Sequence, residues 1–242
     1  AAYSNRLTKA SLIVRDYLHA PDIIGVQEAE NLTVLQDLAA RIDADAATAG
    51  QPLPGYVTHL LEGNDIGGID VGLLTRADVT VHSVDQWRPD ETYISPRSGM
   101  PELLNDRPSL ILDATIQGPA YRLPAHVFVV VNHLRSLNGI DDPVDGVRVR
   151  AKRKAQGESV AQLLIELQTA NPGVPVISVG DYNAFEVNDG YVDLLGIIRG
   201  NQAPPEQVVE WSALGLDPNF VSAAPSGDYS YSFDGNAQTL DH

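Results

Sequence analysis

Four polar side chains stand just after apolar, β-branched runs that are typical of buried strands. They are Glu28, His133, Asp181 and Asn183. Because α/β folds carry their sites at strand ends, a rigid sheet would hold these side chains while leaving their tips accessible. Carboxylate, imidazole and amide groups that converge in this way can transfer protons or bind ions. The pattern therefore predicts a functional site built from strand ends.

Each of these residues taken alone has a simpler interpretation. A glutamate at a strand end is often a surface charge or a helix cap, and a lone histidine is often a core residue with satisfied hydrogen bonds. Asp181 can be a turn residue after Gly180. The occurrence of all four at comparable positions favours the functional interpretation.

The segments that would position these residues show two periodicities. Helical spacing of apolar residues predicts helices over 7–18, 31–42 and 154–169, and short β-branched runs predict strands over 22–28, 69–74, 109–116, 127–132 and 174–179. Strands separated by helices indicate an α/β domain. No repeat or linker tract divides the chain, so we expect a single domain over residues 1–242.

Composition narrows the class of protein. Of the 242 residues, 43% are hydrophobic, which is enough for a substantial core. The apolar runs are far shorter than the roughly 20 residues that cross a bilayer, so we expect no membrane span. Cysteine is absent, which excludes disulfides, thiolate zinc sites and a cysteine nucleophile. With Met100 as the one methionine, few residues can be oxidised, which favours an extracellular or cell-surface bacterial protein.

The net charge of -16 opposes long-range attraction of a polyanion. Two features could offset it locally. Five basic residues fall within positions 148–154, and divalent cations bound to carboxylates would reverse the field around them. The alternative for the basic run is the solvated start of a helix.

Four motifs follow one another along the chain. They are Asp-Ile-Ile-Gly-Val-Gln-Glu-Ala-Glu-Asn at 22–31, Asn-Asp-Arg-Pro at 105–108, Val-Asn-His-Leu-Arg-Ser at 131–136 and Gly-Asp-Tyr-Asn-Ala at 180–184. Together they resemble the endonuclease/exonuclease/phosphatase superfamily over residues 7–242. The resemblance implies a four-layer α/β sandwich with two central, mostly antiparallel sheets flanked by helices. The Asn-His-Leu-Arg-Ser form and the segment 229–242 are similar to bacterial extracellular nucleases.

The resemblance implies a role for each polar residue. Glu28 would bind Mg²⁺ or Mn²⁺, which prefer oxygen ligands, and Ca²⁺ could serve as a structural ion. Asp181 would orient or deprotonate the attacking water, and Asn183 would bind phosphate or metal from the same side of an extended segment. His133 would be an acid, a base or a phosphate donor, as a near-neutral pKa permits. Asp70 could hold His133 or could be a solvated residue at the core edge.

Three further residues would contact the phosphate. Arg107 matches the family's phosphate-binding arginine, whose planar guanidinium can pair with two oxygens, and Asn132 and Arg135 would add contacts. Arg107 could instead form a surface ion pair with Asp106 or Glu102.

The final residues admit two assignments. The string Thr-Leu-Asp-His at 239–242 is more similar to a motif whose aspartate supports a later histidine than to the family's terminal Ser-Asp-His. We therefore include Asp241 among the catalytic residues and keep His242 as the alternative catalytic histidine. The family's opening strand is not recognisable before Leu7. We accordingly expect the domain to be truncated at both ends, without its first and last strands.

The resemblance implies a metal-dependent phosphodiesterase that attacks phosphate with water. The expected function is a nuclease acting on DNA, with RNA as a further substrate, so the expected partner is nucleic acid. A sphingomyelinase, a sugar-phosphate phosphatase and a binding domain that keeps the fold without catalysis are the alternatives. Endonucleolytic or exonucleolytic cleavage, the number of metal ions and the oligomeric state stay open.

Overall fold

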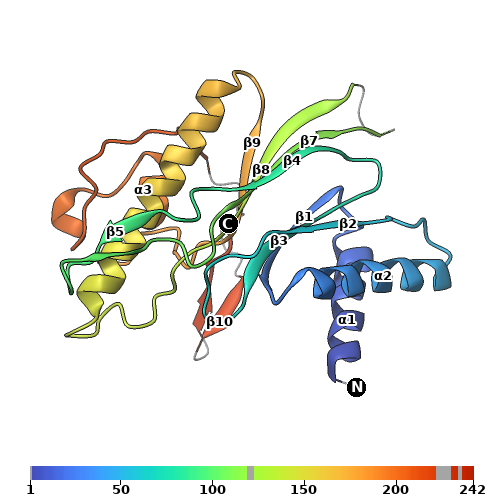
Figure 1. The fold of residues 1–242 in the computed structure, drawn as a ribbon, viewed down its shortest axis with the longest axis horizontal. Helices are drawn as coiled ribbons and strands as arrows, with labels where there is room; N and C mark the ends of the chain where they lie inside the picture. The colour runs from blue at the N-terminus through green and yellow to red at the C-terminus, as the bar shows by residue number, and fades with distance from the viewer. Residues whose placement is uncertain (1, 119–122, 222–229, 234–235) are drawn as a thin grey trace.

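The computed structural model describes residues 2–118, 123–221, 230–233 and 236–242. Two β-sheets lie face to face, and helices cover their outer faces (Figure 1). Neighbouring strands run antiparallel in both sheets except for one parallel pair at the edge of the second sheet. This arrangement confirms the predicted four-layer α/β class with mostly antiparallel central sheets.

Among the described residues, two sheets and two hairpins account for the named strands. The first sheet has the order β1 (Ile23–Ala29), β3 (Asp70–Thr75) and β2 (Val57–Leu60). The second has the order β4 (Thr80–Gln86), β7 (Leu110–Ile116), β8 (Ala125–His133) and β9 (Val176–Asp181). The hairpins are β5 (Thr92–Ile94) with β6 (Pro101–Leu103), and β10 (Tyr231–Phe233) with β11 (Asn236–Gln238).

The outer layers are helical. The helices are α1 (Ala2–Leu12), continued by the π-helical turn η1 (Ile13–Tyr17), then α2 (Leu32–Thr48), α3 (Gly146–Ala170), α4 (Leu194–Arg199) and the 3₁₀ turn η2 (Pro205–Gln207). Helix α2 packs on the first sheet, whereas α3 contacts β9 and α4. In the part of the chain that the structure describes, none of these helices combines the length and the apolar character that crossing a bilayer requires.

The alternation of side chains along β3 explains how the layers are joined. Val71 and Leu73 point into the core between the two sheets, while Leu74 points into the core beneath α2. Gly72 lies on the α2 side, where an added Cβ would come within 2.6 Å of Leu35 Cδ1. The strand therefore reads as a continuous apolar run because both of its faces are buried.

The five predicted strands are confirmed to within two residues, whereas each predicted helix begins earlier or ends later than expected and several short elements were not predicted. Helix α3 begins at Gly146 instead of Lys154, because its first turns bury Lys152 and Arg153 through polar partners that apolar periodicity does not reveal. Strand β4 was not predicted, because a bulge between Val81 and Ser83 breaks the alternation of its side chains.

Candidate active site

The predicted strand ends converge on one cavity. In the parallel pair β8–β9, His133 lies opposite Asp181, so both side chains emerge at the same edge of the second sheet. Glu28 reaches that edge from β1 of the facing sheet. A cavity of about 670 Å³ is lined by these three residues together with Asn183 and Asp241, and the loop 136–141 forms much of its remaining wall.

Glu28 is held in an unusual backbone conformation at the end of β1. The pairing of β1 with β3 shifts register between Val26 and Ala29, and Glu28 has a φ of 56°, in the left-handed region that a non-glycine residue rarely adopts. Its side chain is exposed and lines the cavity. The bulge therefore turns a carboxylate out of the sheet and into the cavity, and such strain is common at functional sites.

Asp181 and Asn183 are joined by a tight local contact. The backbone N–H of Asn183 donates to Asp181 Oδ1 at 2.8 Å, and the Asn183 side-chain amide donates to Leu134 O at 3.1 Å. Asn183 has a φ of 50°, so the segment is a turn and not the extended chain that was expected. Both residues still line the cavity, but it is this turn, and not alternation along a strand, that places them together.

The carboxyl group of Asp181 is harder to ionise than an ordinary aspartate. Burial raises the pKa of Asp181, and the nearby carboxylates of Asp241 and Glu28 raise it further. The N–H bond from Asn183 and the positive charge of Arg107 act in the opposite direction. A carboxylate with a raised pKa is a better proton acceptor once ionised, which suits the role predicted for Asp181.

His133 is buried and is not a near-neutral acid. Burial lowers the pKa of His133 to about 4, and the charge of Arg107 adds to this effect. The expectation of a near-neutral pKa is therefore wrong, and the imidazole is uncharged at neutral pH. Its Nε2 lies 3.7 Å from Asp181 Oδ2. Asp70, which was considered as a hydrogen-bond partner of His133, instead accepts from the Gly63 N–H at 2.8 Å. His133 Nδ1 has no hydrogen-bond partner among the described residues.

The lowered pKa makes stability depend on pH. As the pH falls from about 6.5 to about 4, the unfolded chain takes up a proton at His133 while the folded chain does not, so this contribution to stability is lost across that window. We expect wild type to lose about 3 kcal/mol more unfolding free energy than His133→Gln between these pH values. Urea unfolding in EDTA measures this difference, and equal losses in the two proteins would contradict it.

Arg107 lies beside His133 but does not line the cavity, and its guanidinium is already engaged. Its guanidinium donates to the backbone oxygens of His133 and Leu134 at 3.2 and 3.3 Å, and it pairs with Asp65 at 3.1 Å. The alternative ion pair with Asp106 or Glu102 is wrong, because Asp106 binds Lys152 at 2.8 Å and Glu102 accepts from Tyr93 OH and Ser98 Oγ. Direct phosphate binding by Arg107 stays a prediction, whereas the structure shows it fixing the end of β8 and lowering the pKa of His133.

Asn132 does not face the cavity. It is completely buried, its Oδ1 accepts from Ser109 Oγ at 2.7 Å, and its amide donates to Ser178 Oγ and Tyr182 OH, each at 3.0 Å. The predicted phosphate contact is therefore wrong. Asn132 instead ties β8 to its neighbours, and an unpaired amide at this depth would be costly.

A buried cation, the guanidinium of Arg153, supports the loop that follows β8. Arg153 has no exposed surface and donates to the backbone oxygens of Arg135 and Asn183, while its guanidinium lies 3.5 Å from Asp189. Arg135 itself donates to Ser136 Oγ and Asn138 O, so its predicted phosphate contact stays untested. Sequence reasoning missed Arg153 as a positioning residue, because a basic residue within a charged run carries no sign of burial.

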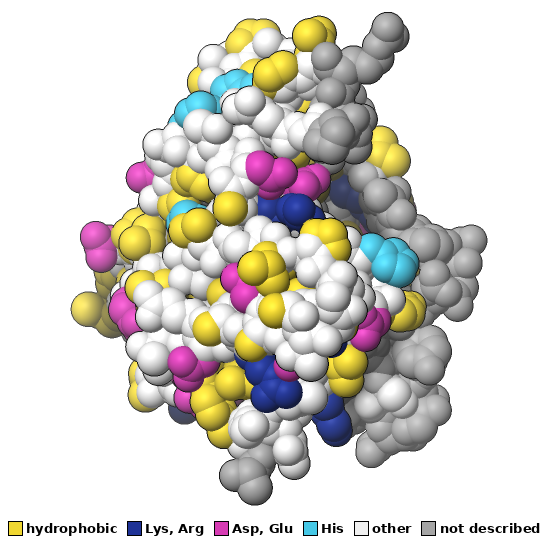
Figure 2. All heavy atoms as spheres, turned by 90° about the vertical axis from the view of Figure 1, so that its right-hand side faces the viewer, with side chains coloured by type: hydrophobic (Ala, Val, Ile, Leu, Met, Phe, Trp, Pro, Cys, Tyr) yellow, Lys and Arg dark blue, Asp and Glu magenta, His cyan; other side chains and the backbone are white. Residues whose placement is uncertain are grey.

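The basic run does not form a surface for nucleic acid. Arg148 pairs with Asp145, Lys152 with Asp106 and Lys154 with Glu210. Arg150 donates to Ile140 O, and Arg153 is buried. The run does lie in the first turns of a helix, α3, but its side chains are paired or buried, so it forms neither a positive patch nor a fully solvated helix start. Figure 2 shows another side of the molecule, that of α1 and α2, where basic and acidic side chains are interspersed.

The two C-terminal candidates point to different places. Residues 240–242 run antiparallel to the end of β9, where His242 and Gly180 exchange backbone hydrogen bonds at 2.9 and 3.0 Å. Asp241 is exposed and lines the cavity of Glu28. His242 turns away, with Nε2 bonded to Ala184 O at 2.9 Å, and does not line that cavity. Part of the preceding motif, 229 and 234–235, lies outside the described residues.

The cavity lining fits a hard divalent cation. Its charged residues are four carboxylates, Glu28, Asp141, Asp181 and Asp241, and a cation would relieve the repulsion that raises the pKa of Asp181. Oxygen donors of this kind favour Mg²⁺ or Mn²⁺ over softer ions. Asp141 was not anticipated from the sequence, although it lies five residues beyond the Asn-His-Leu-Arg-Ser motif.

Comparison with known proteins supports the fold. No family model and no curated protein sequence matches the chain. The chain is similar to the human Nocturnin catalytic domain with bound sulfate anion (TM-score 0.52, 14% identity, 98% of this chain and 73% of that chain). It is also similar to the endonuclease/exonuclease/phosphatase from Bacteroides vulgatus (TM-score 0.52, 18% identity, 83% of this chain and 64% of that chain). A match to TDP2 from Caenorhabditis elegans (0.45, 24%, 77% of this chain) covers 46% of that protein, about half of its length.

Proposed function

We propose that this chain, which has the fold of endonuclease/exonuclease/phosphatase proteins, is a divalent-metal-dependent phosphodiesterase acting on nucleic acid. The observation that carries the proposal is the convergence of Glu28, His133, Asp181 and Asn183 on one cavity, from segments far apart in the sequence. A buried histidine beside an aspartate of raised pKa, within a carboxylate-lined cavity, is typical of catalytic sites.

Each side chain has a task in hydrolysis. Glu28 would hold a divalent cation, which would supply the positive charge that neutralises the phosphate and stabilises the charge developing on its oxygens. Asp181 Oδ1 is held by the Asn183 N–H, which leaves Oδ2 to accept a proton from water. The water oxygen attacks phosphorus, the ester P–O bond breaks, and the leaving oxygen takes a proton from solvent. His133 is uncharged. Its Nε2 lies 3.7 Å from Asp181 Oδ2, so it can orient the same water.

Nucleic acid is proposed as the substrate because of the motifs and not because of charge. The Asn-His-Leu-Arg-Ser string is similar to that of bacterial extracellular nucleases. The absence of cysteine also suits a protein that is exported from a bacterium. Side chains of the basic run already form ion pairs within the protein. Electrostatic capture of a polyanion therefore depends on cations in the cavity. We therefore expect binding and cleavage to depend strongly on Mg²⁺.

The experiment compares substrates in the presence and absence of metal. We expect the chain to hydrolyse plasmid DNA with Mg²⁺ or Mn²⁺ and to lose this activity in EDTA, because the carboxylates otherwise repel phosphate. RNA, sphingomyelin and a sugar phosphate are assayed in parallel. Hydrolysis of the lipid or the sugar phosphate without cleavage of either nucleic acid would replace the nuclease assignment. The absence of metal-dependent hydrolysis of all four substrates would overturn the phosphodiesterase itself.

A further inference from the structure

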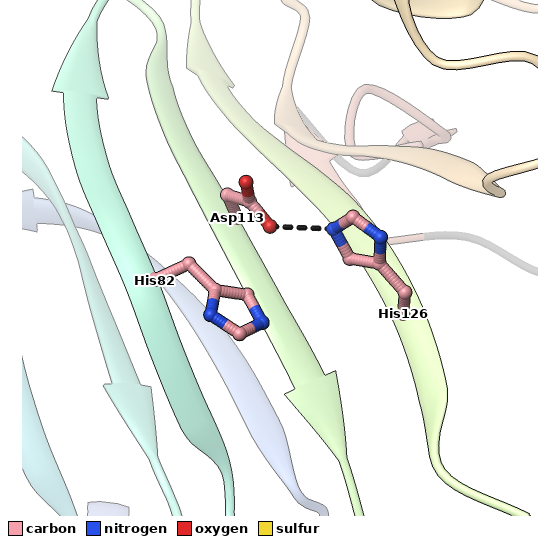
Figure 3. Close-up of side chains that lie close together, drawn as sticks. All are labelled: His82, Asp113 and His126. Carbon is pink, nitrogen blue, oxygen red and sulfur yellow. Dashed lines mark hydrogen bonds and ion pairs between the residues drawn. The ribbon is translucent and has the colours of Figure 1, made fainter.

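A second group of polar side chains lies on the second sheet, away from the cavity. His82, Asp113 and His126 each offer a ligand atom, and these atoms lie within 4.8 Å of one another. His126 Nε2 is 2.7 Å from Asp113 Oδ1, and the two imidazole rings meet edge to face at 5.6 Å. Figure 3 shows the three side chains converging from neighbouring strands.

The sheet fixes this arrangement. His82 comes from β4, Asp113 from β7 and His126 from β8, which are adjacent strands. Asp113 pairs with Phe128, so His126 is its diagonal neighbour on the same face. His82 is the residue at the bulge in β4. Without this bulge its side chain would follow the ordinary alternation along the strand. The sheet thus fixes the backbone positions. The imidazoles of His82 and His126 are exposed, and each has one side-chain hydrogen bond, between His82 Nε2 and Thr115 Oγ1 at 2.8 Å and between His126 Nε2 and Asp113 Oδ1.

The chemistry of this group differs from that of the cavity. Two imidazole nitrogens and one carboxylate oxygen are typical ligands of Zn²⁺ and related transition ions, whereas Mg²⁺ prefers oxygen alone. In a tetrahedral zinc site with bonds of about 2.0–2.1 Å, ligand atoms lie roughly 3.3 Å apart. Small side-chain rotations would bring the present atoms to that spacing. We propose that His82, Asp113 and His126 form a transition-metal site that binds Zn²⁺ and cross-links three strands.

The proposed site is separate from the catalytic cavity. His126 and His133 are seven positions apart on β8, which at about 3.3 Å per residue corresponds to roughly 23 Å. Its three ligands leave a tetrahedral position for water. The proposal does not depend on the proposed phosphodiesterase activity, because its ligands play no part in that reaction.

Zinc titration of the purified chain by calorimetry tests the proposal. Excess Mg²⁺ is present throughout, so that the oxygen-lined cavity is filled with its own ion. We expect wild type to bind one zinc ion at this site, and His82→Ala and His126→Ala to weaken that binding more than about 100-fold, since even the loss of an outer-shell partner weakens metal sites about 10- to 100-fold. Zinc should also shift the ring ¹⁵N signals of His82 and His126 in the wild-type spectrum.

Two variants serve as matched controls. His19→Asn removes an exposed histidine outside the cluster and places asparagine, which tolerates positive φ, at a φ of 57°. Glu28→Gln alters the cavity only. Both should bind zinc as wild type does. If wild type binds no zinc, the cluster is only a hydrogen-bonded pair, and if both alanine variants bind it unchanged, the ion lies elsewhere. Either result overturns the proposal.

Discussion

Asp181→Asn should lower phosphodiester hydrolysis about 10³- to 10⁴-fold while leaving the protein at least as stable as wild type. The fall in rate follows from the loss of a positioned proton acceptor, which contributes up to about 10⁴-fold. The stability follows from the raised pKa of Asp181, which means that burial and the Asp241 and Glu28 carboxylates disfavour its charge. The amide oxygen can still accept from the Asn183 N–H. Single-turnover rates and thermal melts in EDTA measure both effects.

The pairing of the two effects separates catalysis from folding. Substitution of a residue needed only for the fold would lower activity and melting temperature together. Substitution of a catalytic residue whose charge is disfavoured in the folded protein lowers activity but not the melting temperature. Asp85→Asn is the matched control, because Asp85 is an exposed aspartate on β4 outside the cavity. It should change neither quantity. Retention of activity by Asp181→Asn would remove Asp181 from the mechanism.

Strands β3 and β8 were predictable because they are buried on both faces, whereas β1 and β9, which carry Glu28 and Asp181, are mostly half-buried and were recognisable by their β-branched residues. Strand β3 is buried at all of its residues, and β8 at seven of its nine, so both read as unbroken apolar runs. Polar residues that interrupt such runs are conspicuous. Strand β4 gave no such signal, since most of its residues are exposed or half-buried and a bulge disrupts their alternation.

The finer assignments failed where tertiary partners decide the outcome. Asn132 and His133 are neighbours in one motif, yet the first is turned into the core by Ser109 and Tyr182 and the second lines the cavity. Arg153 sits in a charged run but has no exposed surface. Residue type and spacing locate a segment, but whether a polar side chain is a ligand or a structural bond depends on contacts between distant segments.

The strained backbone at Glu28 leads to the second large prediction. Glu28→Gln keeps the shape of the side chain but removes its charge, so the Mg²⁺ concentration needed for activity should rise more than about 100-fold, and the rate at fixed metal should fall about 10³-fold. The size reflects the several kcal/mol of charge stabilisation that a bound cation supplies, at about 1.4 kcal/mol per factor of ten. Activity titrated against Mg²⁺ gives both numbers.

Glu28→Gly distinguishes a functional bulge from a structural one. Glycine adopts a φ of 56° without strain, so this variant should be as stable as wild type, or more stable, while being as inactive as Glu28→Gln. Glu30→Gln, an exposed neighbour that does not line the cavity, should behave as wild type. A loss of stability in Glu28→Gly would mean that the side chain supports the fold. If Glu28→Gln and Glu30→Gln proved equally active, the cation would have to be held by other carboxylates of the cavity, and the strain at Glu28 would lack a catalytic reason.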